Sequence, residues 1–216
     1  MFTALIERDY TDIFGLAYRP RIVSKEDWNH RDMIPEAYGV AQCSGYEFSN
    51  ENRRYLLDYF QAIRDTAQCI VEIGVHRADA NSALTSTSVF LENKRSDTVY
   101  IGIDLDDKSW LDDASKNIYT IRGDSNNYLK LYLLMSALEL SDIDFLFIDG
   151  WHSVNQAIAD WKYVERLRVG GIVGIHDTNT HPGPKLLYDA IGEPFVKAKY
   201  CEVSTDWGIA FATRMR

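Results

Sequence analysis

Residues 144–178 read DFLFIDGWHSVNQAIADWKYVERLRVGGIVGIHDT, and this stretch decides the predicted fold. It holds two short apolar runs, Phe145–Ile148 and Ile172–Ile175, separated by a segment with helical periodicity. Runs of this length do not distinguish a buried strand from a buried helical turn, but Gly150 and the glycine pair at 170–171 favour strands. A strand, a helix and a second strand of this length predict parallel strands joined by a right-handed crossover.

The segment between the two runs has an apolar stripe that predicts a helix. Ser153 is a suitable N-cap, and the glycine pair at 170–171 is expected to end the helix. The stripe repeats at helical spacing and consists of Val154, Ala157, Ile158, Trp161, Val164 and Leu167.

Acidic and imidazole side chains follow both predicted strands. Asp149 and His152 come after the first run, and His176 and Asp177 come after the second. Parallel strands bring their carboxyl ends to one edge of the sheet, which is where open α/β sheets bind ligands. We therefore expect these side chains to form part of a ligand site.

The rest of the chain alternates predicted strands and helices, which is typical of an α/β domain. Residues 1–49 have no sustained period and predict a separate N-terminal cap that shapes the substrate pocket, followed by one domain at 50–216. The proline and glycine residues of Asn179–Pro184 predict an irregular turn. Further strands are expected at Cys69–Ile73, Val99–Ile103, Tyr119–Arg122, Phe195–Val203 and Trp207–Thr213, and further helices around Tyr55–Ile63 with Ser49 or Asn50 as cap, Ala80–Leu91, Tyr128–Leu138 and Lys185–Ile191.

Composition narrows the function classes. The chain has 216 residues, of which 46% are hydrophobic and 25% charged, as in an ordinary globular domain. A net charge of -9 argues against sequence-independent nucleic-acid binding. No apolar run is long enough to span a bilayer, and Met1–Ile6 is too short for a signal-peptide core. Three dispersed cysteines give no disulfide framework, so we expect a cytoplasmic protein. From the charge and the apolar runs we expect neither nucleic-acid nor membrane partners.

The turn after the first predicted strand reads EIGVHRA over residues 72–78. A dinucleotide needs further glycines where its pyrophosphate approaches the backbone, and only Gly74 is present. A ligand without a pyrophosphate does not need them. A nicotinamide-dependent oxidoreductase is therefore a weak alternative.

Five short motifs occur in order along the chain. They are Glu72-Ile73-Gly74, Gly102-Ile103-Asp104, Gly123-Asp124-Ser125, Asp149-Gly150-Trp151-His152, and Gly170-Gly171 followed by His176-Asp177-Thr178. This series resembles class I S-adenosylmethionine-dependent methyltransferases, and among them the small-molecule O-methyltransferases of the macrocin and macrolide-sugar type. The resemblance covers about residues 63–216. It implies a Rossmann-like, doubly wound, mostly parallel seven-stranded sheet with an antiparallel C-terminal strand.

The resemblance also implies a binding site for S-adenosylmethionine. Gly74 would let the methionine part of the cofactor pass over the first turn, and Glu72 would orient its amino group. Asp104 would accept hydrogen bonds from the ribose hydroxyls. Asp124 and Ser125 would flank the adenine.

Similar enzymes place a metal ion and a base after the fourth and fifth strands, which points to Asp149 and Asp177 as metal ligands. Asp149 would border the cofactor too, and His152 matches a general base. A bound cation lowers the pKa of a hydroxyl, and an imidazole with a pKa of about 6.5 can take its proton. Oxygen ligands suit magnesium, whereas a ligating His176 would favour a transition metal. His176 could instead form a hydrogen bond at the sheet edge, so the third ligand stays open.

The expected function is O-methylation of a hydroxyl on a small molecule, assisted by a divalent metal ion such as Mg²⁺. A second hypothesis is a methyltransferase-like domain without catalysis that serves as a binding or assembly partner. It is motivated by Ala78, which replaces a second glycine that the family usually has, and by the lack of a second acid beside Asp177. Homo-oligomerisation is compatible with the sequence.

Overall fold

The computed structural model describes residues 10–11, 17–18, 48–75, 85–179, 181–200 and 206–216. Most of the predicted N-terminal cap at 1–49 therefore lies outside the described residues, as do residues 76–84 and 201–205. Strand β1 (Tyr10–Thr11) pairs with β2 (Ala17–Tyr18) in antiparallel orientation. None of the described helices combines the length and the apolar character needed to cross a membrane.

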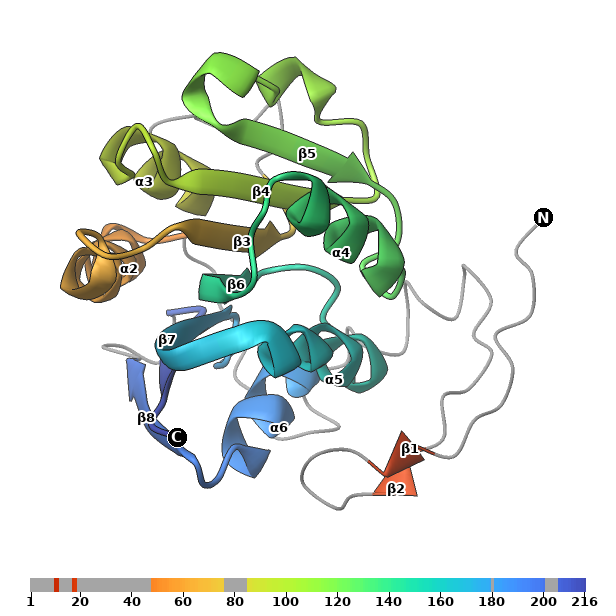
Figure 1. Cartoon of the computed structure of the whole chain (residues 1–216). Coiled ribbons are helices and arrows are strands. Elements are labelled where there is room, and N and C mark those ends of the chain that lie inside the picture. Colours follow the sequence, from red (N-terminus) through yellow and green to blue (C-terminus); the bar gives the residue numbers. More distant parts are fainter. Residues whose placement is uncertain (1–9, 12–16, 19–47, 76–84, 180, 201–205) are drawn as a thin grey trace.

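A seven-stranded sheet forms the centre of the molecule, in the order β5-β4-β3-β6-β7-β9-β8 (Figure 1). Neighbouring strands from β5 to β7 are parallel, and β9 is antiparallel to both β7 and β8. This arrangement confirms the predicted fold class. The strands are β3 (Cys69–Ile73), β4 (Val99–Asp104), β5 (Ile118–Arg122), β6 (Ile143–Ile148), β7 (Leu167–His176), β8 (Phe195–Tyr200) and β9 (Ile209–Arg214).

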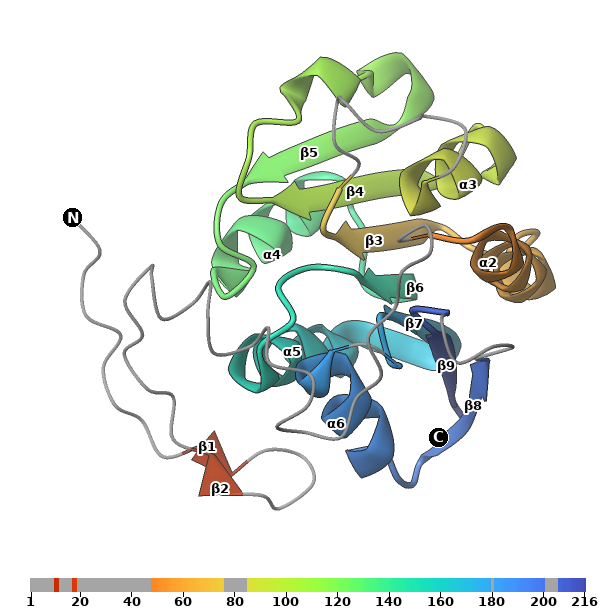
Figure 2. The same cartoon turned by 180° about the vertical axis from the view of Figure 1, so that it is seen from behind.

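Helices cover both faces of the sheet. In Figure 1, α4 and α5 lie in front of the sheet, and the reverse view of Figure 2 brings α2 and α3 forward. The described α-helices are α2 (Asn50–Ile63), α3 (Ser86–Asn93), α4 (Tyr128–Ala137), α5 (Val154–Trp161) and α6 (Pro182–Ala190), and the short 3-10 helices are η3 (Ser109–Leu111), η4 (Ala114–Lys116) and η5 (Lys162–Arg166).

Strand β6 explains why the sheet has a core on each face. All of its residues are buried. Phe145 and Phe147 pack with residues of α2 and α3, whereas Leu146 and Ile148 pack with residues of α4, α5 and α6. Successive side chains of a strand point to opposite faces, so consecutive apolar residues need cover on both sides. This requirement puts β6 in the middle of the sheet.

The predicted helix caps are confirmed. The side chain of Ser153 accepts a hydrogen bond from Gln156 N at 3.0 Å and starts α5. The side chain of Ser49 accepts one from Asn52 N at 3.1 Å and starts α2. Each cap satisfies a backbone N–H that has no partner within its helix.

The predicted end of the crossover helix is wrong. The α-helix ends at Trp161 and continues as η5, and Leu167 already begins β7, so the glycines at 170–171 lie inside a strand. The register of β6 and β7 shifts after the pair Ile143 and Leu167, and Gly170 has a φ of +79° in this irregular stretch. Glycine adopts such a backbone conformation without steric cost. The glycine pair therefore accommodates a bulge instead of ending a helix.

Two further helix starts differ from the prediction. Helix α6 begins at Pro182, inside the predicted irregular turn, because proline fits the first turn of a helix where its missing N–H has no role. Helix α3 begins at Ser86 after the extended cap residue Thr85, later than predicted, and the predicted start at Ala80 lies outside the described residues.

Candidate active site

The predicted site residues follow the carboxyl ends of neighbouring parallel strands. Gly74 follows β3, Asp104 ends β4, Asp124 and Ser125 follow β5, Asp149 follows β6 and Asp177 follows β7. They therefore lie along one edge of the sheet.

Gly74 is required by a close approach of two strand ends. Its φ is +85°, and a Cβ at this position would lie 2.0 Å from the carbonyl oxygen of Asp149. Backbone hydrogen bonds connect this turn to both neighbouring strands. Gly74 N donates to Ile103 O of β4 at 2.9 Å, and Asp149 N, after β6, donates to Ile73 O at 2.8 Å. The structure thus explains this glycine by chain packing, and its predicted contact with a cofactor stays a prediction.

Asp104 holds the same turn from the neighbouring strand. One carboxylate oxygen accepts from Val75 N and the other from Asp106 N, both at 2.8 Å. Lys108 Nζ lies 3.8 Å from Asp104 Oδ2. The predicted ribose contact of Asp104 is untested.

Glu72 lies in the buried layer beneath the site and is fully inaccessible to solvent. Both of its oxygens are occupied by hydroxyl donors, because Ser86 donates to Oε1 while Thr87 and Tyr100 donate to Oε2. Burial raises the pKa of Glu72 to about 7, against the opposing effect of the hydroxyl groups. The structure gives Glu72 partners of its own, and its predicted contact with a cofactor amino group stays a prediction.

Ser125 belongs to a buried network that the sequence did not indicate. Its hydroxyl donates to Asp160 Oδ1 at 2.7 Å, and Gln156 Nε2 donates to both groups, at 2.7 and 2.9 Å. Burial raises the pKa of Asp160 to about 7. Asp124, in contrast, is exposed and accepts from Asn126 N at 2.9 Å. Gln156 and Asp160 are one helical turn apart, but nothing in the sequence links them to the loop after β5.

The ends of β6 and β7 bring together Asp149, His176 and Asp177. His176 Nδ1 lies 3.1 Å from Asp149 Oδ1 and 3.1 Å from Asp177 Oδ1. His176 and Asp177 are almost completely buried. One ligand atom from each of the three residues lies within 4.8 Å of the others, so this set could hold a metal ion.

Helix α2 covers His176 from the opposite side. Asn52 Nδ2 lies 3.3 Å from His176 Nε2 and donates to Asp206 Oδ1 at 3.1 Å. The ring of Phe48 packs against the imidazole at a centroid distance of 5.1 Å. Asn52 is fully buried, and no pattern in the sequence indicated it as part of this site.

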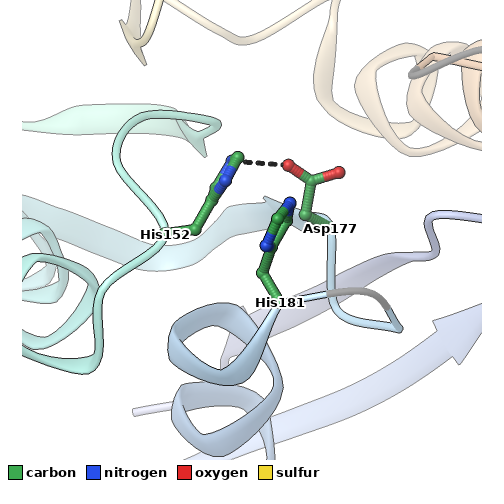
Figure 3. Close-up of side chains that lie close together, drawn as sticks. All are labelled: His152, Asp177 and His181. Atoms are coloured by element: carbon green, nitrogen blue, oxygen red, sulfur yellow. Dashed lines mark ion pairs between the residues drawn. The ribbon is translucent and has the colours of Figure 1, made fainter. Parts of the chain in front are cut away.

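His152 approaches Asp177 on its other oxygen, as Figure 3 shows. His152 Nε2 lies 2.6 Å from Asp177 Oδ2. His181, which the sequence did not link to a motif, stacks on His152 with a centroid distance of 3.9 Å. The structure thus brings together the two predicted acids and the two predicted imidazoles, and adds a third imidazole.

The charges of this cluster are strongly coupled. Burial opposes ionisation of Asp177, but His176 and His152 outweigh it and hold the pKa of this carboxyl well below its usual value. Burial would lower the pKa of either imidazole, yet Asp177 raises the pKa of His152 and, with Asp149, raises that of His176 well above its usual value. Burial raises the pKa of Asp149. Asp177 is therefore a carboxylate anion that is stabilised by the imidazoles of His176 and His152.

The strand order is that of a class I S-adenosylmethionine-dependent methyltransferase fold. Residues 49–178 match the family model described as a methyltransferase domain, and the chain belongs to this family. The predictions of the family and of a methyltransferase enzyme are thereby confirmed. No curated protein matches the chain.

Three solved structures illustrate the fold. MycE, a methyltransferase from the mycinamycin biosynthetic pathway, is 19% identical with a TM-score of 0.56, over 76% of this chain and 49% of MycE. An O-methyltransferase from Bacillus cereus is 17% identical with a TM-score of 0.56, over 89% of this chain and 92% of its own. CalS11, an enzyme in calicheamicin biosynthesis, is 14% identical with a TM-score of 0.54, over 77% of this chain and 81% of CalS11. The chain thus spans about half the length of MycE.

Proposed function

We propose that the chain is an S-adenosylmethionine-dependent O-methyltransferase that methylates a hydroxyl group of a small molecule with the help of a divalent metal ion. The observation that carries the proposal is the 2.6 Å contact between His152 Nε2 and Asp177 Oδ2 at the ends of adjacent parallel strands. An imidazole oriented by a buried carboxylate is suited to accept a proton from a poor nucleophile such as an alcohol.

The names of the solved relatives support this acceptor class. MycE was solved with Mg, SAH and mycinamycin VI, and CalS11 is described as a TDP-rhamnose 3'-O-methyltransferase. The net charge of -9 argues against a nucleic-acid acceptor.

The strand ends also suit the cofactor. Each oxygen of Asp104 accepts one backbone N–H, which leaves lone pairs that ribose hydroxyls could use. Ser125 lies at the end of the neighbouring strand β5, where the adenine is proposed to bind. Bound S-adenosylmethionine would supply an electrophilic methyl group on its sulfonium.

The donor set fits a divalent ion. Both oxygens of Asp177 are buried, and neither accepts a well-formed hydrogen bond among the described residues, although imidazole nitrogens lie 2.6 and 3.1 Å away. A buried carboxylate without good hydrogen bonds is costly unless a cation compensates it. Asp149 and Asp177 would hold the ion, with His176 as the third ligand, and Mg²⁺ suits the two carboxylates. The ion, when bound, would lower the pKa of the acceptor hydroxyl.

The chain's own residues would then move the proton. Asp177 fixes the imidazole of His152 through Nε2 and stabilises the positive charge that the ring gains when it takes the hydroxyl proton. Such general-base assistance typically contributes roughly 100-fold to 10,000-fold to the rate.

A methyl-transfer assay tests the proposal. Chelator-treated protein would be incubated with isotope-labelled S-adenosylmethionine and a panel of nucleotide sugars, glycosylated natural products and phenols, with and without Mg²⁺. We expect one O-methylated product whose formation stops with EDTA and resumes with Mg²⁺. Calorimetric binding of S-adenosylmethionine without transfer to any acceptor would instead favour the hypothesis of a domain that has lost catalysis. Absence of cofactor binding would overturn the proposal.

A further inference from the structure

His152, Asp177 and His181, drawn in Figure 3, form a second set of potential metal ligands. This set shares Asp177 with the proposed magnesium ligands. One ligand atom of each residue lies within 4.8 Å of the others. His152 follows β6, Asp177 follows β7 and His181 precedes α6, so three separate segments converge on this point.

The two sets use different sides of Asp177. Oδ1 faces His176 Nδ1 at 3.1 Å, whereas Oδ2 faces His152 Nε2 at 2.6 Å. His181 belongs to the Oδ2 side because its ring stacks on that of His152 at an interplanar angle of 16°. The set on the Oδ2 side therefore needs neither Asp149 nor His176.

One atom of this second set is buried without a hydrogen-bond partner. His181 is 4% exposed, and its Nδ1 has no partner among the described residues. Asp177 is fully buried, and its Oδ2 has the imidazole of His152 as its neighbour at 2.6 Å. Buried polar atoms are nearly always satisfied, so the unpaired Nδ1 beside this carboxylate indicates a partner other than protein.

The backbone holds the three ligands in place. His181 N donates to Asp177 O at 3.0 Å, and Gly183 N donates to His152 O at 3.1 Å. A Cβ at Gly183 would lie 2.3 Å from His152 O, so only glycine permits this approach. Asp177 itself has a φ of +59°, a left-handed conformation that is uncommon for residues other than glycine.

We propose that His152, Asp177 and His181 bind a divalent transition metal such as Zn²⁺ on the opposite side of Asp177, the residue they share with the magnesium set. Two imidazoles and one carboxylate suit Zn²⁺ and Co²⁺, whereas Mg²⁺ prefers oxygen ligands. Three protein ligands leave coordination positions open for water or another small ligand.

This site has a consequence that rests on the proposed function. An ion bound to His152 Nε2 occupies the imidazole that would take the hydroxyl proton. Zn²⁺ would then inhibit methyl transfer, while Mg²⁺ at the other side of Asp177 supports it.

X-ray absorption of Zn²⁺-loaded protein tests the site without any activity measurement. Tag-free, full-length protein would be treated with chelator and loaded with one equivalent of Zn²⁺. The proposed set predicts two imidazole ligands at about 2.0–2.1 Å. A spectrum with one imidazole would assign the ion to Asp149, His176 and Asp177 and overturn the proposal, as would an absence of binding.

Variants in a Co²⁺ titration separate the two sets. Loss of a group that only supports a metal ligand typically lowers metal affinity by roughly 10- to 100-fold. His181→Asn removes a proposed ligand itself, so it should weaken Co²⁺ binding by at least this factor. The matched variant Asp149→Asn should keep the affinity of the unmodified chain within about 3-fold, because Asp149 lies outside the second set. The opposite pattern, loss in Asp149→Asn and no change in His181→Asn, would contradict the proposal. If His181→Asn does not fold, the number of imidazole ligands in the X-ray absorption spectrum of the unmodified chain still tests the proposal.

Discussion

His152 Nε2 lies 2.6 Å from Asp177 Oδ2, although the two residues follow different strands. The contact exists because β6 and β7 are parallel neighbours, so that both residues emerge at one sheet edge. Burial alone would lower the pKa of the His152 imidazole, but the Asp177 carboxylate raises it above its usual value. The pair therefore links the fold directly to the proposed proton transfer.

Replacing His152 by Asn should lower kcat by roughly 100-fold to 10,000-fold, the usual contribution of a general base. Calorimetric binding of S-adenosylhomocysteine should not change, because the ring faces Asp177 and His181 instead of the ends of β3 to β5. Single-turnover kinetics would measure the chemical step. An unchanged kcat would remove His152 from the mechanism and leave the fold assignment intact.

Replacing Gly74 by Ala should destabilise the fold. The new Cβ would lie 2.0 Å from Asp149 O, and the φ of +85° is unfavourable for alanine. Backbone strain of this kind costs roughly 1–3 kcal/mol, and relief of the clash must separate β3 from β6. Urea unfolding measures the loss. Gly192→Ala is the matched control, because no atom lies within 4 Å of its added Cβ, and it should change stability by less than about 0.5 kcal/mol.

The sequence predicted the central strands of the sheet well because their signal is local. Consecutive apolar residues such as Phe145–Ile148 need cover on both faces wherever they occur, and an acid at or after the ends of β4, β5, β6 and β7 marks where these strands stop. The placement of Asp149 and Asp177 at one edge then follows from parallel pairing alone.

Features that depend on contacts between distant segments were missed. The glycines at 170–171 act in a bulge against β6, and a glycine pair alone does not reveal whether it ends a helix or bends a strand. His181 gains its place from Gly183 packing on the backbone of His152, and Asp160 gains its place from Ser125. No local pattern encodes either contact.

Replacing Asp144 by Ala should be strongly destabilising. Its side chain is 7% exposed, accepts from Gln68 N and Cys69 N at 2.8 Å each, and pairs with Arg168 at the start of β7. Removal of the carboxylate leaves the buried Cys69 N without its acceptor, which costs about 1–3 kcal/mol, and loss of the pair with the partly exposed Arg168 adds a smaller amount. Thermal and urea unfolding would measure it. Asp142→Ala, at an exposed neighbouring position, should stay within about 0.5 kcal/mol, and equal effects of the two variants would refute the role of Asp144.

Replacing Asp160 by Asn should change how stability depends on pH. Burial raises the pKa of Asp160 in the folded chain to about 7, whereas an unfolded Asp has a pKa of about 3.9. Between these values the folded state binds more protons than the unfolded state, so the free energy of unfolding falls as pH rises from about 4 to 7. For one titrating group, the free energy of unfolding falls by at most about 1.4 kcal/mol per pH unit.

The asparagine variant lacks this titration, so its stability relative to the unmodified chain should increase with pH and level off above about pH 7. Glu72, whose pKa is also raised to about 7 by burial, contributes a slope of the same sign, and Glu72→Gln combined with Asp160→Asn should flatten the profile further. Urea unfolding at pH 5, 6, 7 and 8 measures the slope, with Asp142→Asn as the exposed control. If the slope of Asp160→Asn matches that of the unmodified chain, Asp160 is ionised in the folded protein at neutral pH, and its bonds to Ser125 and Gln156 outweigh its burial.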